Sequence, residues 1–140
     1  MMTNIENLLL SDLFTIYLTF SGILLSLITL LYSFINGKRS EIELCAEAIK
    51  SGIKDPMMKK RQRNLAQQIK QLSRLNNKFF VLILLSLAAC IISWVSIRFI
   101  PYNYHSGILF LLVFISIIIG FLTVKTMWKL YLQYKDDIKI

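Results

Sequence analysis

The sequence is poor in the residue types that build catalytic centres, metal sites and disulfide frameworks. Its 140 residues include one histidine and two cysteines. Cys45 falls in a segment predicted below to be cytoplasmic and Cys90 in a predicted membrane helix, so we expect neither a disulfide nor a metal site. A glycine-rich phosphate loop and a paired nucleophile and base are also missing. We therefore expect a protein that is not an enzyme and that uses no cofactor.

Proline is equally scarce. Pro56 and Pro101 are the only two, and neither lies inside a long apolar run. Transporter folds typically show repeated halves and helices that break at mid-membrane depth, and the sequence has neither feature. A transporter is therefore disfavoured.

What the sequence does have is apolar side chains in three long runs. It is 56% hydrophobic and carries a net charge of +8, so apolar and basic residues must be segregated along the chain. The runs cover residues 13–34, 79–100 and 107–127. Each has the roughly 20 residues that cross a hydrocarbon core of about 30 Å. The sequence predicts an all-α membrane protein with three transmembrane helices in one domain.

Lysine and arginine are distributed unevenly around these runs. Eleven lie between the first two runs, four lie near or after the end of the third, and none precedes the first. The positive-inside rule then places the N-terminus outside. Residues 1–12 become an outer interfacial segment and residues 101–106 an outer turn, whereas 35–78 and 128–140 become cytoplasmic.

Residues 35–78 predict a helical hairpin rather than a loose loop, because apolar residues recur at helical spacing on both sides of "SGIKDP". Gly52 suits the left-handed position after a helix end, Asp55 an N-cap and Pro56 the first helical position. The first helix should therefore continue to about Ser51, and the second should begin at Pro56. The tail 128–140 should extend the third helix. His105, in the outer turn, is expected to be exposed at the membrane interface.

Small and polar residues recur on one side of the first predicted span, in steps of three and four. They are Asp12, Thr15, Thr19, Gly22, Ser26, Thr29, Ser33 and Asn36. Between Asp12 and Asn36, Ser21 is the only other glycine, serine, threonine, asparagine or aspartate. This spacing averages 3.5 residues and drifts by only about 20° per seven residues on a straight helix. We call these eight residues the polar stripe.

Two explanations of the polar stripe remain open. Helices in lipid meet at small residues that let backbones approach, so the stripe is suited to packing. Similar seams occur in the second span (Ser86, Ala89, Ser93, Ser96) and in the third (Ser116, Gly120, Thr123). Alternatively, hydroxyl-rich faces repeated around an axis would line a water-filled path. Three helices leave no lumen, so such a path requires a homo-oligomer.

Charged residues near the stripe give mixed signals. Asp12 would ring the outer entrance of a path and Lys38 with Arg39 the inner one, so ion preference is not predicted. Glu41, Glu43 and Glu47 alternate with basic residues at helical spacing, which is typical of an ordinary helix surface. The densest cationic run, "KKRQR", supplies Lys59, Lys60, Arg61 and Arg63. With Lys38 and Arg39, these residues are candidates for contact with anionic lipids or for binding a nucleotide or oligonucleotide.

The layout resembles that of small pore-forming membrane effectors of bacterial anti-phage defence operons. The shared features are the polar-faced helix Thr15–Asn36 and the basic tip "KKRQR". The resemblance implies an ion channel in the bacterial inner membrane that opens under control of a nucleotide or oligonucleotide and collapses the membrane potential. The alternative is a non-conducting scaffold or anchor, whose hairpin docks a soluble cytoplasmic protein and whose stripe only packs helices.

Overall fold

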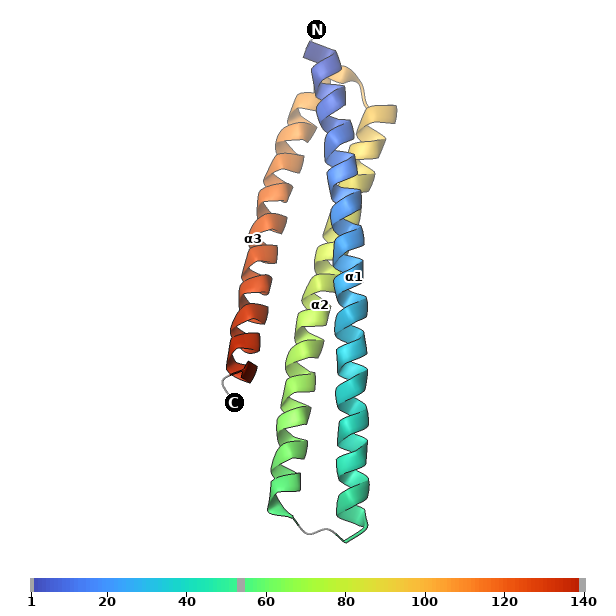
Figure 1. Ribbon diagram of the computed structural model, residues 1–140. Helices are drawn as coiled ribbons and strands as arrows, with labels where there is room; N and C mark the ends of the chain where they lie inside the picture. The colour runs from blue at the N-terminus through green and yellow to red at the C-terminus, as the bar shows by residue number, and fades with distance from the viewer. Residues whose placement is uncertain (1, 53–54, 139–140) are drawn as a thin grey trace. The chain divides into compact units, whose positions relative to one another are not determined.

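The computed structural model describes residues 2–52 and 55–138, and all of its regular structure there is helical (Figure 1). Helix α1 spans Met2–Lys50, α2 spans Pro56–Phe99 and α3 spans His105–Ile138, with a short 3-10 helix η1 at Tyr102–Tyr104. All three long helices are apolar enough to cross a membrane. The prediction of an all-α protein with three helices long and apolar enough to cross a membrane is confirmed.

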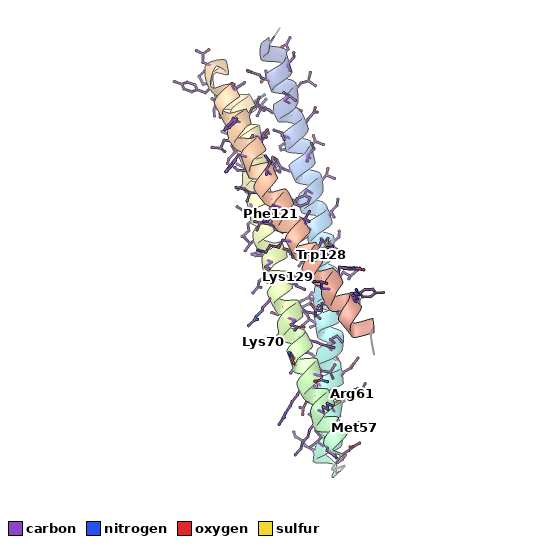
Figure 2. The ribbon with its side chains drawn as sticks, turned by 90° about the vertical axis from the view of Figure 1, so that its left-hand side faces the viewer. Met57, Arg61, Lys70, Phe121, Trp128 and Lys129 are labelled. Atoms are coloured by element: carbon purple, nitrogen blue, oxygen red, sulfur yellow. The ribbon has the colours of Figure 1, made fainter. Side chains whose placement is uncertain are left out.

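Helices α1 and α3 are longer than the membrane spans predicted for them. Helix α1 runs without a break through residues 2–12, so the predicted outer segment and first span are one helix. Helix α3 continues through residues 128–138, as expected of the tail. Large apolar side chains such as Phe121 and Trp128 are exposed on α3, as lipid-facing residues would be (Figure 2).

The chain divides into two compact units. The first combines Met1–Leu25 with Phe79–Ile140, and the second is Ser26–Lys78. In the first unit, the start of α1 packs antiparallel to α2 through hydroxyl-to-carbonyl hydrogen bonds. Ser93 Oγ donates to Leu10 O at 2.6 Å, and Ser86 Oγ donates to Tyr17 O at 3.0 Å. The small-residue seam predicted on the second span is thus a packing surface, and all its members are buried: Ser86, Ala89, Ser93 and Ser96.

A buried polar network joins all three helices of this unit at the level of Tyr17. Its hydroxyl donates to Leu112 O on α3 at 2.8 Å and also contacts Ser116 Oγ. One turn further along α1, Ser21 Oγ lies 2.8 Å from Tyr17 O and 3.0 Å from Ser86 Oγ. Each such bond between membrane helices stabilises their contact by about 0.6 kcal/mol on average.

His105 is buried rather than exposed, so the expectation of an exposed histidine is wrong. Only 1% of its surface is accessible. Its Nε2 lies 3.1 Å from Ser96 O and 3.0 Å from Ile100 O, at the end of α2. Carbonyl oxygens only accept hydrogen bonds, so Nε2 carries the proton and donates. The last carbonyl groups of a helix have no N–H partner within the helix. The Nε2–H of His105 supplies a donor to one of them, the carbonyl of Ser96.

The second unit is a helical hairpin of α1 and α2 around a small apolar core. Its buried residues are Leu31, Ile35, Cys45, Leu65 and Leu75. Both cysteines of the chain, Cys45 and Cys90, are free and buried.

The turn of the hairpin has the predicted chemistry. Gly52 has a φ of +95°, which residues with a side chain rarely adopt. Asp55 Oδ1 accepts a hydrogen bond from Met57 N at 2.9 Å, which caps the helix that begins at Pro56. Ile53 and Lys54 lie outside the described residues.

One face of α1 carries its contacts in both units. Buried and half-buried residues recur on it at steps of three and four. In the first unit these are Leu10, Phe14, Tyr17, Ser21 and Leu24, and in the second Ile28, Leu31, Ile35, Lys38, Ile42 and Cys45. We call this set the packing seam of α1. Its spacing averages 3.5 residues, the period of knobs-into-holes packing.

Ser86 is fully buried between α1 and α2, so a larger side chain at this position should destabilise the fold. We expect Ser86→Leu to lower the free energy of unfolding by about 1–3 kcal/mol, because overpacking forces side chains or backbone to move. The matched control is Ala88→Leu on the exposed side of α2. Thermal unfolding in detergent, followed by circular dichroism, measures both variants. Equal melting temperatures for the two would contradict the assignment of the seam.

The buried ring of His105 makes a second prediction. His105→Ala should lower the free energy of unfolding by about 1–3 kcal/mol, because it leaves the carbonyls of Ser96 and Ile100 without this donor. His105→Gln restores an N–H donor and should recover part of the loss. The same unfolding assay applies. If alanine is tolerated as well as histidine, the ring does not hold the end of α2.

Candidate functional site

The polar stripe is exposed along its whole length. In the first unit, Asp12, Thr15, Thr19 and Gly22 are exposed, and in the second Ser26, Thr29, Ser33 and Asn36 are exposed. All eight are therefore accessible on the surface of the chain. Ser21, which lies between Thr19 and Gly22 in the sequence, packs against α2 instead.

The stripe and the packing seam lie on opposite sides of α1. Thr19 is two residues after Tyr17 and two residues before Ser21, and every other stripe residue also lies two residues before a seam residue. Four of them also lie one residue after a seam residue, about 100° around the helix: Thr15, Gly22, Thr29 and Asn36. Two residues correspond to about 200° around a helix of 3.6 residues per turn. Packing within the chain therefore orients the stripe away from the other helices that α1 contacts.

Gly22 supports this separation of the two faces. A β-carbon built on Gly22 would meet no atom within 4 Å, so contact with its own chain does not require a glycine there. The same holds for Gly120 of the seam predicted on the third span, and that glycine is exposed. Ser116 and Thr123 of that seam are half-buried. Close approach at these glycines, where it occurs, must involve something outside the chain.

The hydroxyls of Thr15 and Thr19 in the stripe donate their hydrogen bonds within α1. Thr15 Oγ1 donates to Ser11 O at 3.1 Å, and Thr19 Oγ1 donates to Thr15 O at 2.8 Å. Bonds of this kind satisfy the donor locally, in lipid as well as in water. The hydroxyl oxygen keeps lone pairs for an outside partner. At these two positions the face offers acceptors, suited to water or to cations.

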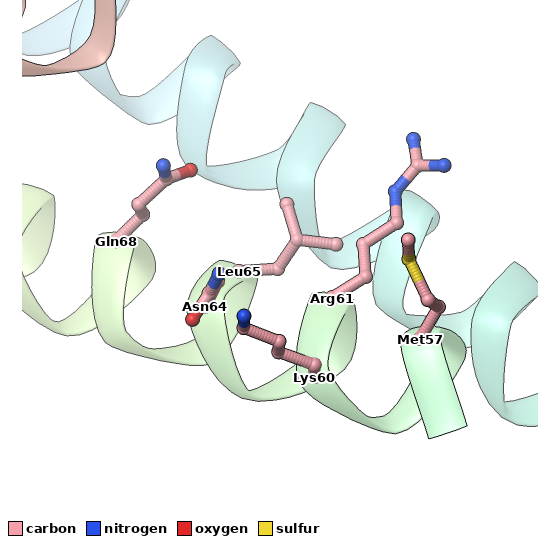
Figure 3. A pocket seen from close by; sticks show the side chains of 6 residues that line it. All are labelled: Met57, Lys60, Arg61, Asn64, Leu65 and Gln68. Carbon is pink, nitrogen blue, oxygen red and sulfur yellow. The ribbon is translucent and has the colours of Figure 1, made fainter. Parts of the chain in front are cut away.

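The predicted cationic site lies in the second unit, along one flank of α2. An open hollow of about 350 Å³ is lined by Met57, Lys60, Arg61, Asn64, Leu65 and Gln68 (Figure 3). Figure 3 shows Arg61, Leu65 and Gln68 extending toward α1. The volume is near the lower end of the range for small-molecule sites. Two cations, two amides and two apolar side chains suit a ligand with an anionic group and an apolar part.

The structure brings together only part of the predicted cationic set. Lys60 and Arg61 line the hollow, whereas Lys59 and Arg63 are exposed outside it. Lys38 is half-buried in the packing seam of α1, and Arg39 is exposed on the same helix. Helix α2 contains no aspartate or glutamate from Pro56 to Phe99, so no acid on this helix offsets the charge of the hollow.

The sequence analysis did not identify the uncharged residues that line the hollow, nor Tyr17 and Ser21 of the packing seam. Met57, Asn64, Leu65 and Gln68 follow one another along a single helix flank, at spacings that place them beside Lys60 and Arg61. That periodicity was available in the sequence but is common on helix surfaces. Tyr17 and Ser21 lie on a face of α1 with the same spacing as the stripe, and only their tertiary contacts identify it as the packing face.

Comparison with known proteins gives no relative from which a function would follow. No protein-family model, no characterised protein and no solved structure matches this chain. The assignment of function therefore rests on the residues and geometry described above.

Proposed function

We propose that the protein is a homo-oligomeric channel of the bacterial inner membrane, with the polar stripes of several copies lining the path. One observation carries the proposal. Eight small and polar residues are exposed on the side of α1 opposite to its packing seam. Inside a membrane, small and polar side chains gain little from contact with lipid tails. They are better placed against another helix or against water.

Assembly of several copies around an axis would place their stripes around a shared water-filled path. A single chain of three helices encloses no lumen, and homo-oligomers usually adopt closed symmetry. Copies arranged in a ring, with the stripe inward, would bring the oxygens of Thr15 and Thr19 to a shared axis. The packing seam would then face away from that axis, toward α2.

The distribution of charge supports one orientation in the membrane. The segment before the first span lacks lysine and arginine, and eleven of these residues lie between the first two spans. The N-terminus would then be outside, and the hairpin and C-terminal tail cytoplasmic. The hollow on α2 would face the cytoplasm, where a nucleotide or oligonucleotide signal could control opening. In anti-phage defence, such opening would collapse the membrane potential.

The conducting role of the stripe predicts a selective loss of flux. Changing Thr19, Ser26 and Ser33 to leucine should abolish ion flux through liposomes, because bulky apolar groups would narrow and dry the path. The oligomer should remain intact by size-exclusion chromatography. The control changes three exposed apolar residues of the same helix, Ile16, Ile23 and Leu30, to methionine and should retain flux.

Two results would contradict the proposal. Unchanged flux in the leucine variant would show that ions do not pass along the stripe. Absence of flux in the wild-type protein, with every nucleotide and voltage applied, would favour the alternative of a scaffold whose hairpin docks a soluble partner.

The hollow predicts a specific loss of anion binding. Changing Lys60 and Arg61 to glutamine should weaken binding of ATP or of a short oligoadenylate to the full-length protein in detergent by at least about tenfold, since hydrogen bonds to charged groups contribute about 1.5–3 kcal/mol each. Lys70→Gln, on the same helix but outside the hollow, is the control. Fluorescence anisotropy measures both. Equal losses in the two variants would indicate diffuse attraction to a basic surface and no site at the hollow.

A further inference from the structure

Four basic side chains lie along one exposed face of α2 in the second unit. They are Lys59, Arg63, Lys70 and Arg74, and each is exposed. On a helix of 3.6 residues per turn, their positions fall within about 60° of arc and extend over about 22 Å of the helix. Figure 2 shows Lys70 extending from α2 on the side away from α1. We call these four residues the basic face of α2.

The basic face is separate from the packing of the hairpin and from the hollow. The buried residues of this arm, Leu65 and Leu75, lie about 100–180° around the helix from each of the four basic residues. The cations that line the hollow are Lys60 and Arg61, and none of the four is among its lining residues. The face is therefore a second cationic surface of α2, with a different direction.

The charges of α2 all have one sign. The helix contains no aspartate or glutamate from Pro56 to Phe99. The nearest carboxylate in sequence is that of Asp55, four residues before Lys59, and its Oδ1 accepts the capping hydrogen bond from Met57 N. Beyond that first turn, no acid of the same helix offsets the basic face, so the face attracts anions along most of its length.

The basic face also lacks an apolar anchor. No large apolar side chain of α2 is exposed between Met57 and Phe80. The exposed residues interleaved with the four basic ones are Ala66, Gln67 and Ser73. Protein interfaces usually have a core that is enriched in aromatic and apolar side chains. Lysine, arginine, glutamine and serine are instead typical of contacts with the phosphates and sugars of nucleic acids.

Anionic lipids account for only one end of the basic face. The predicted second span begins just after Lys78. Along the helix, Arg74 lies about 6 Å before Lys78, Lys70 about 12 Å and Lys59 about 28 Å. Charges in water are screened over about 8 Å at physiological ionic strength. A helix that leaves the membrane along its axis therefore brings only Arg74 close to the headgroups, and the rest of the face requires a soluble polyanion.

We propose that the basic face binds duplex DNA through its phosphates, without reading the base sequence. Aromatic side chains, on which the bases of single strands stack, are missing from α2 between Pro56 and Lys78. The major groove of B-DNA admits an α-helix, whereas that of duplex RNA is deep and narrow. The inference goes beyond the proposed function. It uses neither the polar stripe nor the hollow, so it stands whether or not the protein conducts ions.

The release of counterions from DNA sets the size of the expected effect. Neutralising one phosphate contributes about −0.9 to the slope of log affinity against log salt concentration. Four contacts give a slope of about −3.6, which lowers the affinity about a hundredfold between 50 and 200 mM salt. Each basic residue that is removed should reduce the slope by about one.

Fluorescence anisotropy of a short labelled DNA duplex tests the proposal on the full-length protein in phosphatidylcholine nanodiscs. The wild type should show the steep salt dependence, and affinity should not depend on the base sequence. Arg63→Gln combined with Lys70→Gln should weaken binding at least about tenfold at 100 mM salt and reduce the slope by about two. The matched control is Arg39→Gln combined with Lys50→Gln, which removes the same charge from exposed residues of α1 and should bind as the wild type does.

Three results would overturn the proposal. One is a wild-type affinity that does not change with salt. Another is an equal loss in the two double variants, which would show diffuse attraction to a basic protein and no defined face. The third is displacement of the labelled duplex by polyglutamate, duplex RNA or phosphatidylserine vesicles as efficiently as by unlabelled DNA at the same concentration of charge. That result would assign the face to an acidic protein, to RNA or to a membrane surface.

Discussion

Helices inside a lipid bilayer gain little from burying apolar side chains against one another, because lipid tails are equally apolar. Their contacts depend on close backbone approach and on hydrogen bonds. In this protein, Ser93 and Ser86 of α2 donate to the carbonyls of Leu10 and Tyr17 on α1. These bonds determine which side of the start of α1 is turned inward. The orientation of every other residue on that segment follows from them.

As a consequence of this orientation, α1 has two distinct faces, one that packs within the chain and one that is exposed. The packing seam takes up Tyr17 and Ser21, and the polar stripe remains exposed on the opposite side. A chain that used its small residues only for internal contact would bury them, as α2 does with Ser86 and Ser93. The difference between the two helices is the strongest support for an intermolecular role of the stripe.

Much of the fold could be predicted from local patterns in the sequence. Apolar runs of sufficient length predict helices that can cross a membrane, and the glycine, aspartate and proline at 52, 55 and 56 predict a turn between two helices. These features depend on a few neighbouring residues. The burial of His105 depends instead on where the end of α2 lies in space, and no local signal reports it.

The choice between two regular faces of α1 was also beyond the sequence. Both the stripe and the seam repeat every 3.5 residues, and either spacing suits helix contact. Only the tertiary contacts of Tyr17 and Ser21 show which one packs. At the hollow, only Lys60 and Arg61 of the predicted cationic set are lining residues. Lys59 and Arg63 lie outside the hollow, because they are on other sides of α2.

The central claim is that the polar stripe faces water in the assembled membrane protein, and cysteine accessibility measures this most directly. In a background with Cys45 and Cys90 changed to serine, single cysteines would be placed at each position from Thr15 to Asn36. They would be treated with a charged, membrane-impermeant thiol reagent. We predict labelling at steps of three and four residues, at Thr15, Thr19, Gly22, Ser26, Thr29, Ser33 and Asn36. Labelling that avoids these positions, or that is confined to the two ends of the helix, would contradict it.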